Sequence, residues 1–434
     1  MDRSVFVQRC NTWAANGTPF LFVIDYDLKH FHMVKPGDAA SQQIFYQVGE
    51  RSNVSGAMGT VSDAKGTVPG SGGTVSGSGG TVSGSKDAVS GSGGTASGSE
   101  DAVSGSRGTA SGSGGTQHRD RKNEPSSIDV NRIQQRKGNT FPGSGVDVER
   151  GQQHASRENS WSDAHKLPFR PPADFRFDLS PVPFSRYEKA FKLVRKNILH
   201  GNSFLLNLTF PTAIDTDLSL EEIFLHSQAP YKLYFKDQFV LFSPESFIQI
   251  RDGEIYSYPM KGTIDASVPH AEQKLMENEK ELWEHNTIVD LIRNDLSMVA
   301  RNVEVTKYRY IDRVRTHKNE LLQVSSEIRG QLGGAWKGRL GEILLQLLPA
   351  GSISGAPKKK TREIIAAAEG EKRGYFTGIF GIFDGENVDS AVMIRFIERA
   401  GNGLQFRSGG GITGHSDVQQ EYNEMIDKVY VPFI

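Results

Sequence analysis

The sequence is poor in cysteine, in net charge and in long apolar runs. Its 434 residues include a single cysteine, Cys10, which excludes an internal disulfide framework and any metal site built from cysteines alone. The formal net charge is −1, so no overall basic field favours nucleic acid or an anionic membrane surface. No apolar run approaches the roughly 18 residues that a membrane-spanning helix requires, and residues 1–17 lack the apolar core of a signal peptide. We therefore expect a soluble, cytoplasmic protein with no nucleic-acid or membrane partner.

Residues 54–166 differ sharply in composition from the rest of the chain. Within this segment, residues 70–111 are six seven-residue units that begin with Gly-Ser, such as GSGGTVS and GSKDAVS. Each unit carries at most a small apolar pair, so the period of seven provides no apolar seam for a coiled coil. Such a composition cannot bury enough apolar surface to offset the entropy of ordering. We interpret the segment as a low-complexity Gly/Ser/Thr insertion and expect it to be disordered.

The segments on either side of the insertion indicate one domain of mixed α+β type. Short runs of β-forming residues alternate with segments of helical spacing, and this mixed pattern favours antiparallel sheets. We therefore divide the chain into an N-terminal strand segment (residues 1–53), the insertion (54–166) and the main domain (167–434). The expected strands are 20–26, 204–210, 232–242, 247–250, 254–258, 378–383, 390–398 and 404–408, and the expected helices are 185–200, 275–299, 341–348, 361–369 and 418–431.

A predicted hairpin brings an acid and an amine together. Asp252-Gly253 is a two-residue turn, and its register places Glu245 opposite Met260. A bulge near Pro259, which cannot donate a ladder hydrogen bond, would place Lys261 directly across from Glu245. An ordinary cross-strand ion pair has the same spacing, so the pattern alone leaves the role of the two side chains open.

Further carboxylates lie on two predicted helices. Glu284 precedes Ile288 of an apolar stripe by one turn, so it faces the core side of its helix and needs a cation or a metal as partner. Glu421, Glu424 and Lys428 share one face of the last helix, and two carboxylates on such a face suit Mg²⁺. The alternatives are a solvated helix face and a surface salt bridge.

Two glycine-rich segments offer backbone donors. Residues 349–358 (PAGSISGAPK) place Gly and Ser before a helix, where backbone N–H groups can face an anion. Gly409, Gly410 and Gly411 follow a strand and permit close approach of a ligand to the backbone. The segment at residues 349–358 alone resembles many ordinary turns.

Taken together and in order, these segments resemble the chorismate-utilising family, which comprises the large subunits of anthranilate synthase and aminodeoxychorismate synthase and the isochorismate synthases. The resemblance covers residues 169–434 and a shorter stretch at 20–31. It implies a chorismate-binding catalytic domain of the α+β class, in which two antiparallel sheets pack face to face with helices outside. The motifs are SPESF, PMKGT, EHNTIVDLIRNDL, PAGSISGAPKKKTREII, GYFTGIFG, AVMIRF, GGGITGHSD and EYNEMIDKV.

Position 261 distinguishes the members of this family. Anthranilate synthases typically carry Ala in this motif (PIAGT), whereas aminodeoxychorismate synthases carry Lys (PIKGT), and this chain has Lys261. In the enzymes that it resembles, the lysine attacks C2 of chorismate while the C4 hydroxyl leaves, and ammonia then attacks C4 and expels the lysine. Glu245 is the matching acid for the departing hydroxyl. The resemblance thus implies a transferase, aminodeoxychorismate synthase component I, which acts on the way to 4-aminobenzoate and folate.

The resemblance also assigns the remaining site residues. It implies Mg²⁺ as the cofactor, held by Glu284 and Glu424, and an active-site histidine at His285. It places one chorismate carboxylate near Arg395 and Lys428. The other substrate-binding positions that it implies are Gly262, Thr263, Phe376, Gly409, Gly410 and Gly411.

Two departures and one absence refine this expectation. Phe376 stands where relatives often have Tyr or Trp, and Leu205 stands where isochorismate synthases have a general-base Lys, which argues against water as the nucleophile. Cys10 is in no nucleophile context, so we expect a separate glutamine amidotransferase subunit to deliver the ammonia.

Two alternatives remain at this point. The first is anthranilate synthase component I, which uses the same substrates. The second is a non-catalytic interaction module whose functional part is the repeat, although the presence of Lys261, Glu245, Glu284 and Glu424 argues against a decayed site.

Removal of residues 54–166 tests the role of the insertion. We expect the shortened protein to turn over chorismate at nearly the rate of the full chain, because the entropic cost of a long surface insertion grows only slowly with its length. A steady-state assay of both proteins checks this. A shortened protein that folds but has lost all turnover would show that the insertion takes part in catalysis.

Overall fold

The computed structural model describes residues 1–54, 175–315 and 320–433. The predicted insertion lies outside the described residues apart from Val54, and so do its predicted C-terminal boundary at residues 166–167 and its predicted disorder. The described residues on both sides of it belong to one compact unit.

The described strands are numbered in chain order. The first group is β1 (Phe20–Ile24), β2 (Phe31–Val34), β3 (Ile44–Val48), β4 (Arg51–Ser52), β5 (Phe177–Ser180), β6 (Leu205–Thr216), β7 (Tyr231–Phe235), β8 (Phe239–Ser243) and β9 (Ser246–Arg251). The second group is β10 (Glu254–Ser257), β11 (Met260–Asp265), β12 (Arg301–Arg315), β13 (Glu320–Gln331), β14 (Gly355–Ala356), β15 (Ile379–Phe383), β16 (Val388–Val392), β17 (Phe396–Ala400) and β18 (Gly403–Ile412).

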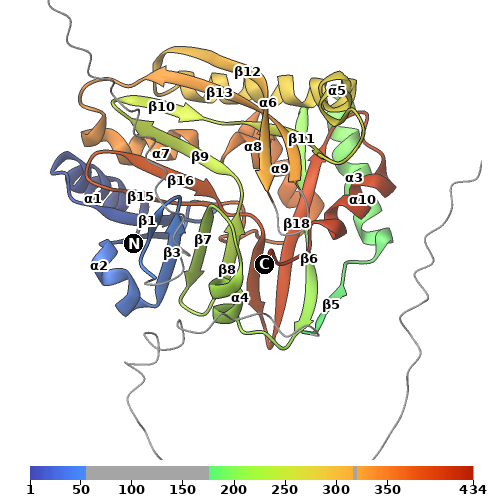
Figure 1. Ribbon diagram of the computed structural model, residues 1–434, viewed down its shortest axis with the longest axis horizontal. Coiled ribbons are helices and arrows are strands. Elements are labelled where there is room, and N and C mark those ends of the chain that lie inside the picture. The colour runs from blue at the N-terminus through green and yellow to red at the C-terminus, as the bar shows by residue number, and fades with distance from the viewer. Residues whose placement is uncertain (55–174, 316–319, 434) are drawn as a thin grey trace, which may run out of the picture. The chain divides into compact units, whose positions relative to one another are not determined.

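These strands form two sheets, in which every pairing is antiparallel (Figure 1). Sheet 1 has the order β11-β13-β10-β9-β16-β15-β1-β2, and β12 pairs with β13. Sheet 2 has the order β14-β6-β18-β17-β8-β7-β3-β4, and β5 pairs with β6. Segments from both sides of the insertion therefore share each sheet.

The described helices lie between and around these strands. They are α1 (Arg3–Ala15), α2 (Pro36–Ala39), α3 (Phe184–Leu199), α4 (Leu220–His226), α5 (Ala271–Glu277), α6 (Glu279–Ser297), α7 (Leu340–Leu347), α8 (Gly351–Ser354), α9 (Lys358–Glu369) and α10 (Val418–Asp427), with 3₁₀ turns at Ala40–Gln42 and Trp336–Arg339. Among the described residues, no helix has both the length and the hydrophobicity to span a bilayer.

An apolar core fills the space between the two sheets. Phe380 and Ile382 of sheet 1 belong to the same buried cluster as Leu233, Leu241 and Phe396 of sheet 2. All residues of β1, β7, β8 and β15 are buried, because one face of each strand meets the opposite sheet and the other face meets helices or loops. The predicted α+β class with two antiparallel sheets packed face to face is confirmed.

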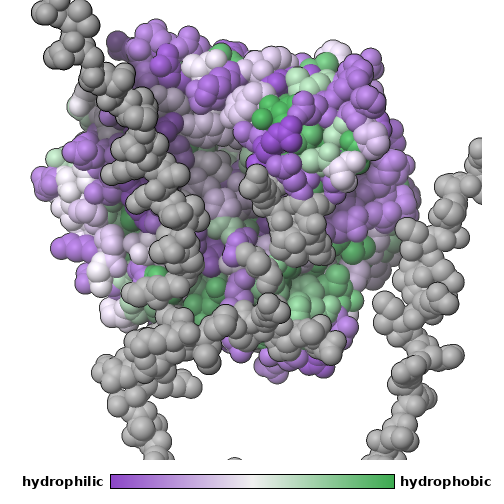
Figure 2. All heavy atoms as spheres, in the orientation of Figure 1, coloured by the Kyte–Doolittle hydropathy of each residue, from purple (hydrophilic) through white to green (hydrophobic). Residues whose placement is uncertain are grey.

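Helices cover the outer faces of both sheets. On sheet 1, α1 and α7 pack over β1 and β15 through one large apolar cluster. On sheet 2, α4 covers one end, and α3, α9 and α10 cover the other end beside β6 and β18 (Figure 1). The surface that Figure 2 shows is mostly hydrophilic along the upper edge, over β12, and apolar side chains gather over the lower ends of β6 and β18.

Several predicted elements are divided or absent in the structure. The predicted helix 275–299 is two helices, because the Asn278 side chain accepts a hydrogen bond from Glu281 N–H and caps the second. The predicted strand 390–398 is interrupted at Arg395, whose φ of +52° lies outside the β region. The helix α1 was not predicted, although Phe6, Cys10 and Ala14 are fully buried at helical spacing.

Gly341 at the start of α7 tests the packing of α1. A Cβ at Gly341 would lie 2.9 Å from Val7 Cα, so Gly341→Ala must push α1 away despite the better helix propensity of Ala. We expect a loss of about 1–3 kcal/mol of unfolding free energy, measured by thermal or denaturant unfolding. Gly338→Ala, where a Cβ meets no atom of the described residues within 4 Å, is the matched control and should not destabilise the fold.

Candidate active site

A cavity of about 600 Å³ lies beside the apolar core, at the end of the two sheets that contains β6, β11 and β18. The alternation of β6 creates one of its walls. Leu206 and Leu208 point to the cluster under α3 and α9, whereas Leu205, Asn207 and Thr209 line the cavity. The opposite wall comes from β11 and α6, and α8 and α10 contribute to its sides.

Lys261 on β11 lines this cavity, but its position differs from the predicted one. The hairpin register is as predicted, with Arg251 opposite Glu254. Beyond Ser257 the chain leaves β9, and β11 pairs with β13 at the far edge of sheet 1, so the predicted pairing of Glu245 with Met260 or Lys261 is wrong. A register shift does occur nearby, around Gly262 at a φ of +77°.

The ammonium group of Lys261 pairs with a carboxylate of α6. Lys261 Nζ lies 3.2 Å from Glu284 Oε2, and both side chains are largely buried. A Cβ at Gly411 would lie 3.6 Å from the same Nζ, so the glycine strand lies directly against the lysine. Ile288 lines the cavity as well, which agrees with the predicted shared face of Glu284 and Ile288.

Glu245 lines the same cavity from the loop before β9. Its carboxylate accepts a hydrogen bond from the Ser352 hydroxyl of α8. Burial raises the pKa of Glu245 above its ordinary value, and the hydrogen bond from Ser352 and the charges of Lys261, Lys428 and Arg395 offset only part of this effect. The acid and the amine are therefore in one site, although they come from strands that do not pair.

His285 lies behind the cavity wall and not on it. The side chain is 1% exposed and is absent from the cavity lining. Its Nε2 lies 2.6 Å from Ser326 Oγ of β13, and its Nδ1 has no hydrogen-bond partner among the described residues. Burial, together with the positive charges of Arg309 and Lys261, lowers the pKa of His285 to about 4. A neutral imidazole in this place cannot touch a ligand in the cavity unless the wall moves.

The carboxylates of α10 approach the glycine strand closely. A Cβ at Gly410 would lie 3.1 Å from Glu421 Oε2 and 3.5 Å from Glu424 Oε1. Lys428 Nζ lies 2.6 Å from Glu424 Oε1 and donates to the carbonyl of Gly409 at 2.9 Å. The predicted salt bridge between Glu424 and Lys428 thus forms at the cavity, where it is still partly exposed to solvent.

The glycines of β18 keep one backbone edge open. β17 pairs with β18 only as far as Arg407, while β6 pairs with β18 to its end. Gly409, Gly410 and Gly411 are therefore bonded to a strand on one side only, and the other side faces the cavity. Backbone N–H groups on such an open edge can bind an anion.

The other predicted substrate-binding residues also line the cavity. Arg395 donates through Nη1 to the carbonyl of Lys428 at 3.4 Å, and its buried Nε has no partner in the part of the chain that the structure describes. Phe376 is buried against Phe396, while Gly262 and Thr263 lie beside Lys261. The structure thus brings together every predicted site residue except His285.

Several cavity residues were not predicted from the sequence. Ser352 belongs to the glycine-rich segment at residues 349–358, and Glu421 shares one face of α10 with Glu424 and Lys428. The sequence therefore pointed to the neighbourhood of each. Asp295, whose Oδ2 lies 2.9 Å from Lys358 Nζ, and Thr377 lie within two of the quoted motifs, but no role was assigned to either. Both line the cavity, and the motifs alone do not state that their side chains face it.

Acidic groups outnumber basic groups around the cavity. Among the described residues, no three His, Cys, Asp or Glu side chains are grouped to hold a metal ion, so a cation here would complete its shell with water or ligand oxygens. Mg²⁺ accepts such a site, since it binds one or two protein carboxylates. The lining carboxylates are Glu245, Glu281, Glu284, Asp295, Glu421 and Glu424, and the lining cations are Lys261, Arg395, Arg407 and Lys428.

Comparison with known proteins places the chain in a family. Residues 130–433 match the family model described as chorismate binding enzyme. The chain belongs to the chorismate-binding enzyme family. The structure of the menaquinone-specific isochorismate synthase from Escherichia coli shares the fold, with a TM-score of 0.50 and 20% identity over 61% of this chain and 64% of that one.

Relatives in this family carry several names. A Haemophilus influenzae protein named PabA-like is 58% identical over 60% of this chain and 80% of its own length. Anthranilate synthase component 1 1 of Haloarcula marismortui is 34% identical over 54% of this chain and half of its own length. Aminodeoxychorismate synthase component 1 of Salmonella typhimurium is 29% identical over 62% of each chain.

The raised pKa of Glu245 predicts a pH-dependent cost to stability. The folded protein holds this proton more tightly than the unfolded chain does, so the free energy of unfolding falls as the pH rises from the ordinary carboxyl pKa through the raised one. We expect Glu245→Gln to raise the melting temperature at pH 8 and to change it less at pH 4, where the carboxyl is mostly protonated in both states.

Glu327 is the matched control for that measurement. Partial burial opposes the shift, but hydrogen bonds from Thr306 and Lys307 lower the pKa of Glu327, so Glu327→Gln should lower the melting temperature at pH 8. If Glu245→Gln destabilised the protein at pH 8 as well, the proposed cost of its burial would be wrong.

Proposed function

We propose that this chain is component I of aminodeoxychorismate synthase, which converts chorismate and ammonia to 4-amino-4-deoxychorismate on the way to 4-aminobenzoate and folate. The observation that carries the proposal is the amine of Lys261, which lies inside the cavity beside Glu284 and the glycine strand. The names of the Haemophilus and Salmonella relatives support it.

Lys261 acts as the nucleophile in the proposed reaction. Its neutral amine forms a bond to C2 of chorismate while the C4–oxygen bond breaks, and Glu245 gives a proton to the departing hydroxyl, which leaves as water. Ammonia then attacks C4, and the bond between C2 and Lys261 breaks to return the amine. The first step needs a neutral amine. The ammonium group of Lys261, which pairs with Glu284, must therefore lose a proton before it attacks.

The raised pKa of Glu245 suits the role of an acid. A carboxyl group with a raised pKa keeps its proton to higher pH than an ordinary one and can donate it to a leaving group. Ser352 fixes the orientation of this carboxyl. Leu205 lies on the cavity wall against Gly411 and provides no base to activate water, which favours ammonia as the second nucleophile.

One carboxylate of chorismate binds at an anion-binding corner, which is formed by Arg395, Lys428 and the open backbone edge at Gly409–Gly411. The two carboxylates of the substrate would otherwise enter a cavity that already has more acidic than basic groups. Glu284 and Glu424 would hold Mg²⁺, which supplies positive charge for the second carboxylate. We propose a separate glutamine amidotransferase as the source of ammonia.

Product analysis tests the proposal directly. Incubation with chorismate, Mg²⁺ and ammonia should yield a product that becomes 4-aminobenzoate only after addition of a 4-amino-4-deoxychorismate lyase. Lys261→Ala should lower the rate by at least about 100-fold and abolish any covalent adduct detected by mass spectrometry. Lys307→Ala is the matched control, since Lys307 also pairs with a carboxylate at 3.2 Å but on the exposed surface.

Fluorescent anthranilate formed without a lyase would contradict the proposal and favour anthranilate synthase. Full activity of Lys261→Ala would contradict the covalent route while leaving the product assignment intact.

A further inference from the structure

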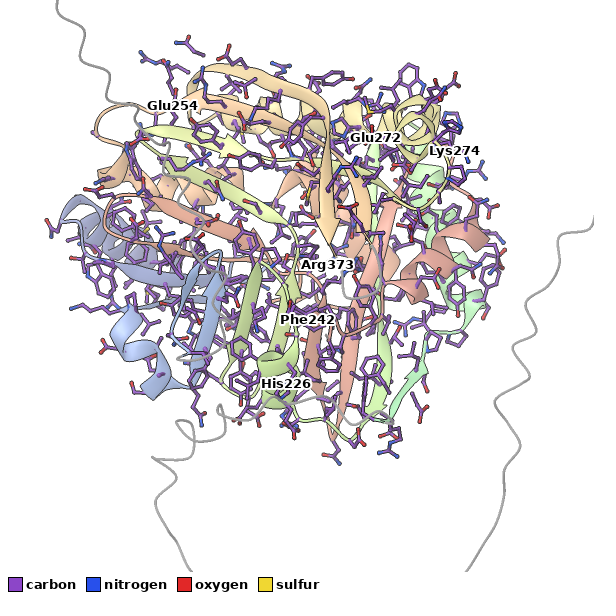
Figure 3. All side chains as sticks on the ribbon, viewed as in Figure 1. His226, Phe242, Glu254, Glu272, Lys274 and Arg373 are labelled. Carbon is purple, nitrogen blue, oxygen red and sulfur yellow. The ribbon has the colours of Figure 1, made fainter. Side chains whose placement is uncertain are left out.

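An ion pair inside the fold has no part in the proposed chemistry. Arg373 Nη2 lies 2.6 Å from Glu369 Oε1, and Arg373 Nε lies 3.0 Å from Glu369 Oε2. Both side chains are 1% exposed. Figure 3 shows Arg373 in the interior, whereas Glu254, Glu272 and Lys274 lie toward the upper edge. Removing two charges from water is costly, so such a pair is retained only with excellent geometry or a further role.

The remaining donors of Arg373 reach three separate segments of the chain. Nη2 donates to the carbonyl of Asn207 in β6 at 2.7 Å. Nη1 donates to the carbonyl of Ile353 in α8 at 3.0 Å and to the hydroxyl of Thr377, before β15, at 3.3 Å. Asn207, Ile353 and Thr377 all line the catalytic cavity. One planar guanidinium thus joins three walls of the site.

Glu369 extends the same network along β6. Its Oε1 accepts from the backbone N–H of Thr209 at 3.0 Å and from the hydroxyl of Thr209 at 2.9 Å. Thr209 is two residues beyond Asn207 and also lines the cavity. The pair therefore fixes β6 at two successive positions that face the ligand.

Thr377 shows that one of these walls is held against strain. Its φ is +62°, a conformation in which a β-branched residue is a true outlier and which persists only where the surroundings enforce it. The backbone N–H of Thr377 donates to the carbonyl of Met393 at 2.8 Å. A Cβ at the next residue, Gly378, would lie 2.2 Å from the carbonyl of Ile24, so the turn has no room to relax in that direction.

The bond to Ile353 connects Arg373 to the proposed acid. Ile353 follows Ser352, whose hydroxyl donates to the carboxylate of Glu245. α8 has only four residues, Gly351–Ser354, so few contacts within the helix can fix the direction of Ser352. The position of the Glu245 carboxylate thus depends on a segment that Arg373 holds from behind.

We infer that Arg373, paired with Glu369, is a positioning residue that sets β6, α8 and the Thr377 turn around the bound substrate and thereby aligns Glu245 for proton transfer. This inference rests on the proposed function for its activity assay. Arg373 touches no substrate, because it is buried behind the residues that line the cavity.

A double variant separates positioning from stability. Arg373→Met alone leaves Glu369 as an unpaired buried charge and should lower both the melting temperature and kcat. In Glu369→Gln/Arg373→Met both charges are gone, while Gln keeps an acceptor for Thr209. We expect this double variant to recover most of the melting temperature but to retain a kcat about 100-fold below wild type, since small misplacements of catalytic groups have effects of that size.

The chorismate dissociation constant, measured by titration calorimetry, should change less than kcat does. Ser352→Ala should reproduce part of the loss in kcat without loss of the ion pair. Lys232→Met is the matched control, because Lys232 is a buried cation that bonds the carbonyls of Phe224 and Ser227 away from the cavity. It should lower the melting temperature and leave kcat unchanged.

Recovery of kcat together with the melting temperature in the double variant would overturn the inference and leave Arg373 a purely structural role. Absence of aminodeoxychorismate formation by the wild-type protein would instead reject the proposed function. The two failures are distinguished because the wild-type assay decides the second before any variant is compared.

Discussion

The register of β18 on β6 determines both the core and the cavity. Nine residue pairs, from Leu404 opposite Ile214 to Ile412 opposite Leu206, join the two strands. Because side chains alternate between the faces of a strand, one set packs under the helices and the other faces the opposite sheet. At the cavity end, the inward set includes Gly409 and Gly411, so the interior opens there. A slip of one residue would put leucines into the cavity and polar side chains into the core.

The charged groups around this open interior balance one another in part. Lys261 pairs with Glu284 and Lys428 pairs with Glu424, so two of the carboxylates are matched within the protein. Glu245 instead retains a raised pKa, because burial outweighs the nearby positive charges. Burial of the Glu245 carboxylate therefore costs free energy in the folded protein. Such a cost is expected at a functional site, where the residues are placed for chemistry and not for stability.

The sequence predicted the class of fold and the members of the site better than it predicted the path of the chain. Turn chemistry correctly set the hairpin at Asp252-Gly253, since that information is local. The course of β11 depends on pairing with β13, more than 50 residues later in the chain, which no local pattern encodes. β12 and β13 were missed for the same reason. His285 was transferred from motif position alone, and a motif does not state which face of a helix meets a ligand.

Glycine has no side chain, so the cavity walls built from Gly409–Gly411 lack the side-chain packing that holds the strands in place elsewhere in the fold. Side chains that interdigitate hold the apolar end of the sandwich, but Gly409–Gly411 contribute none. Directional hydrogen bonds must then define the geometry, and their donors have to be shielded from water to be strong. The Glu369–Arg373 pair meets both conditions, because it is buried and its bonds reach β6, α8 and the Thr377 turn. A buried charge pair contributes little to stability, but this pair can fix the positions of the cavity walls.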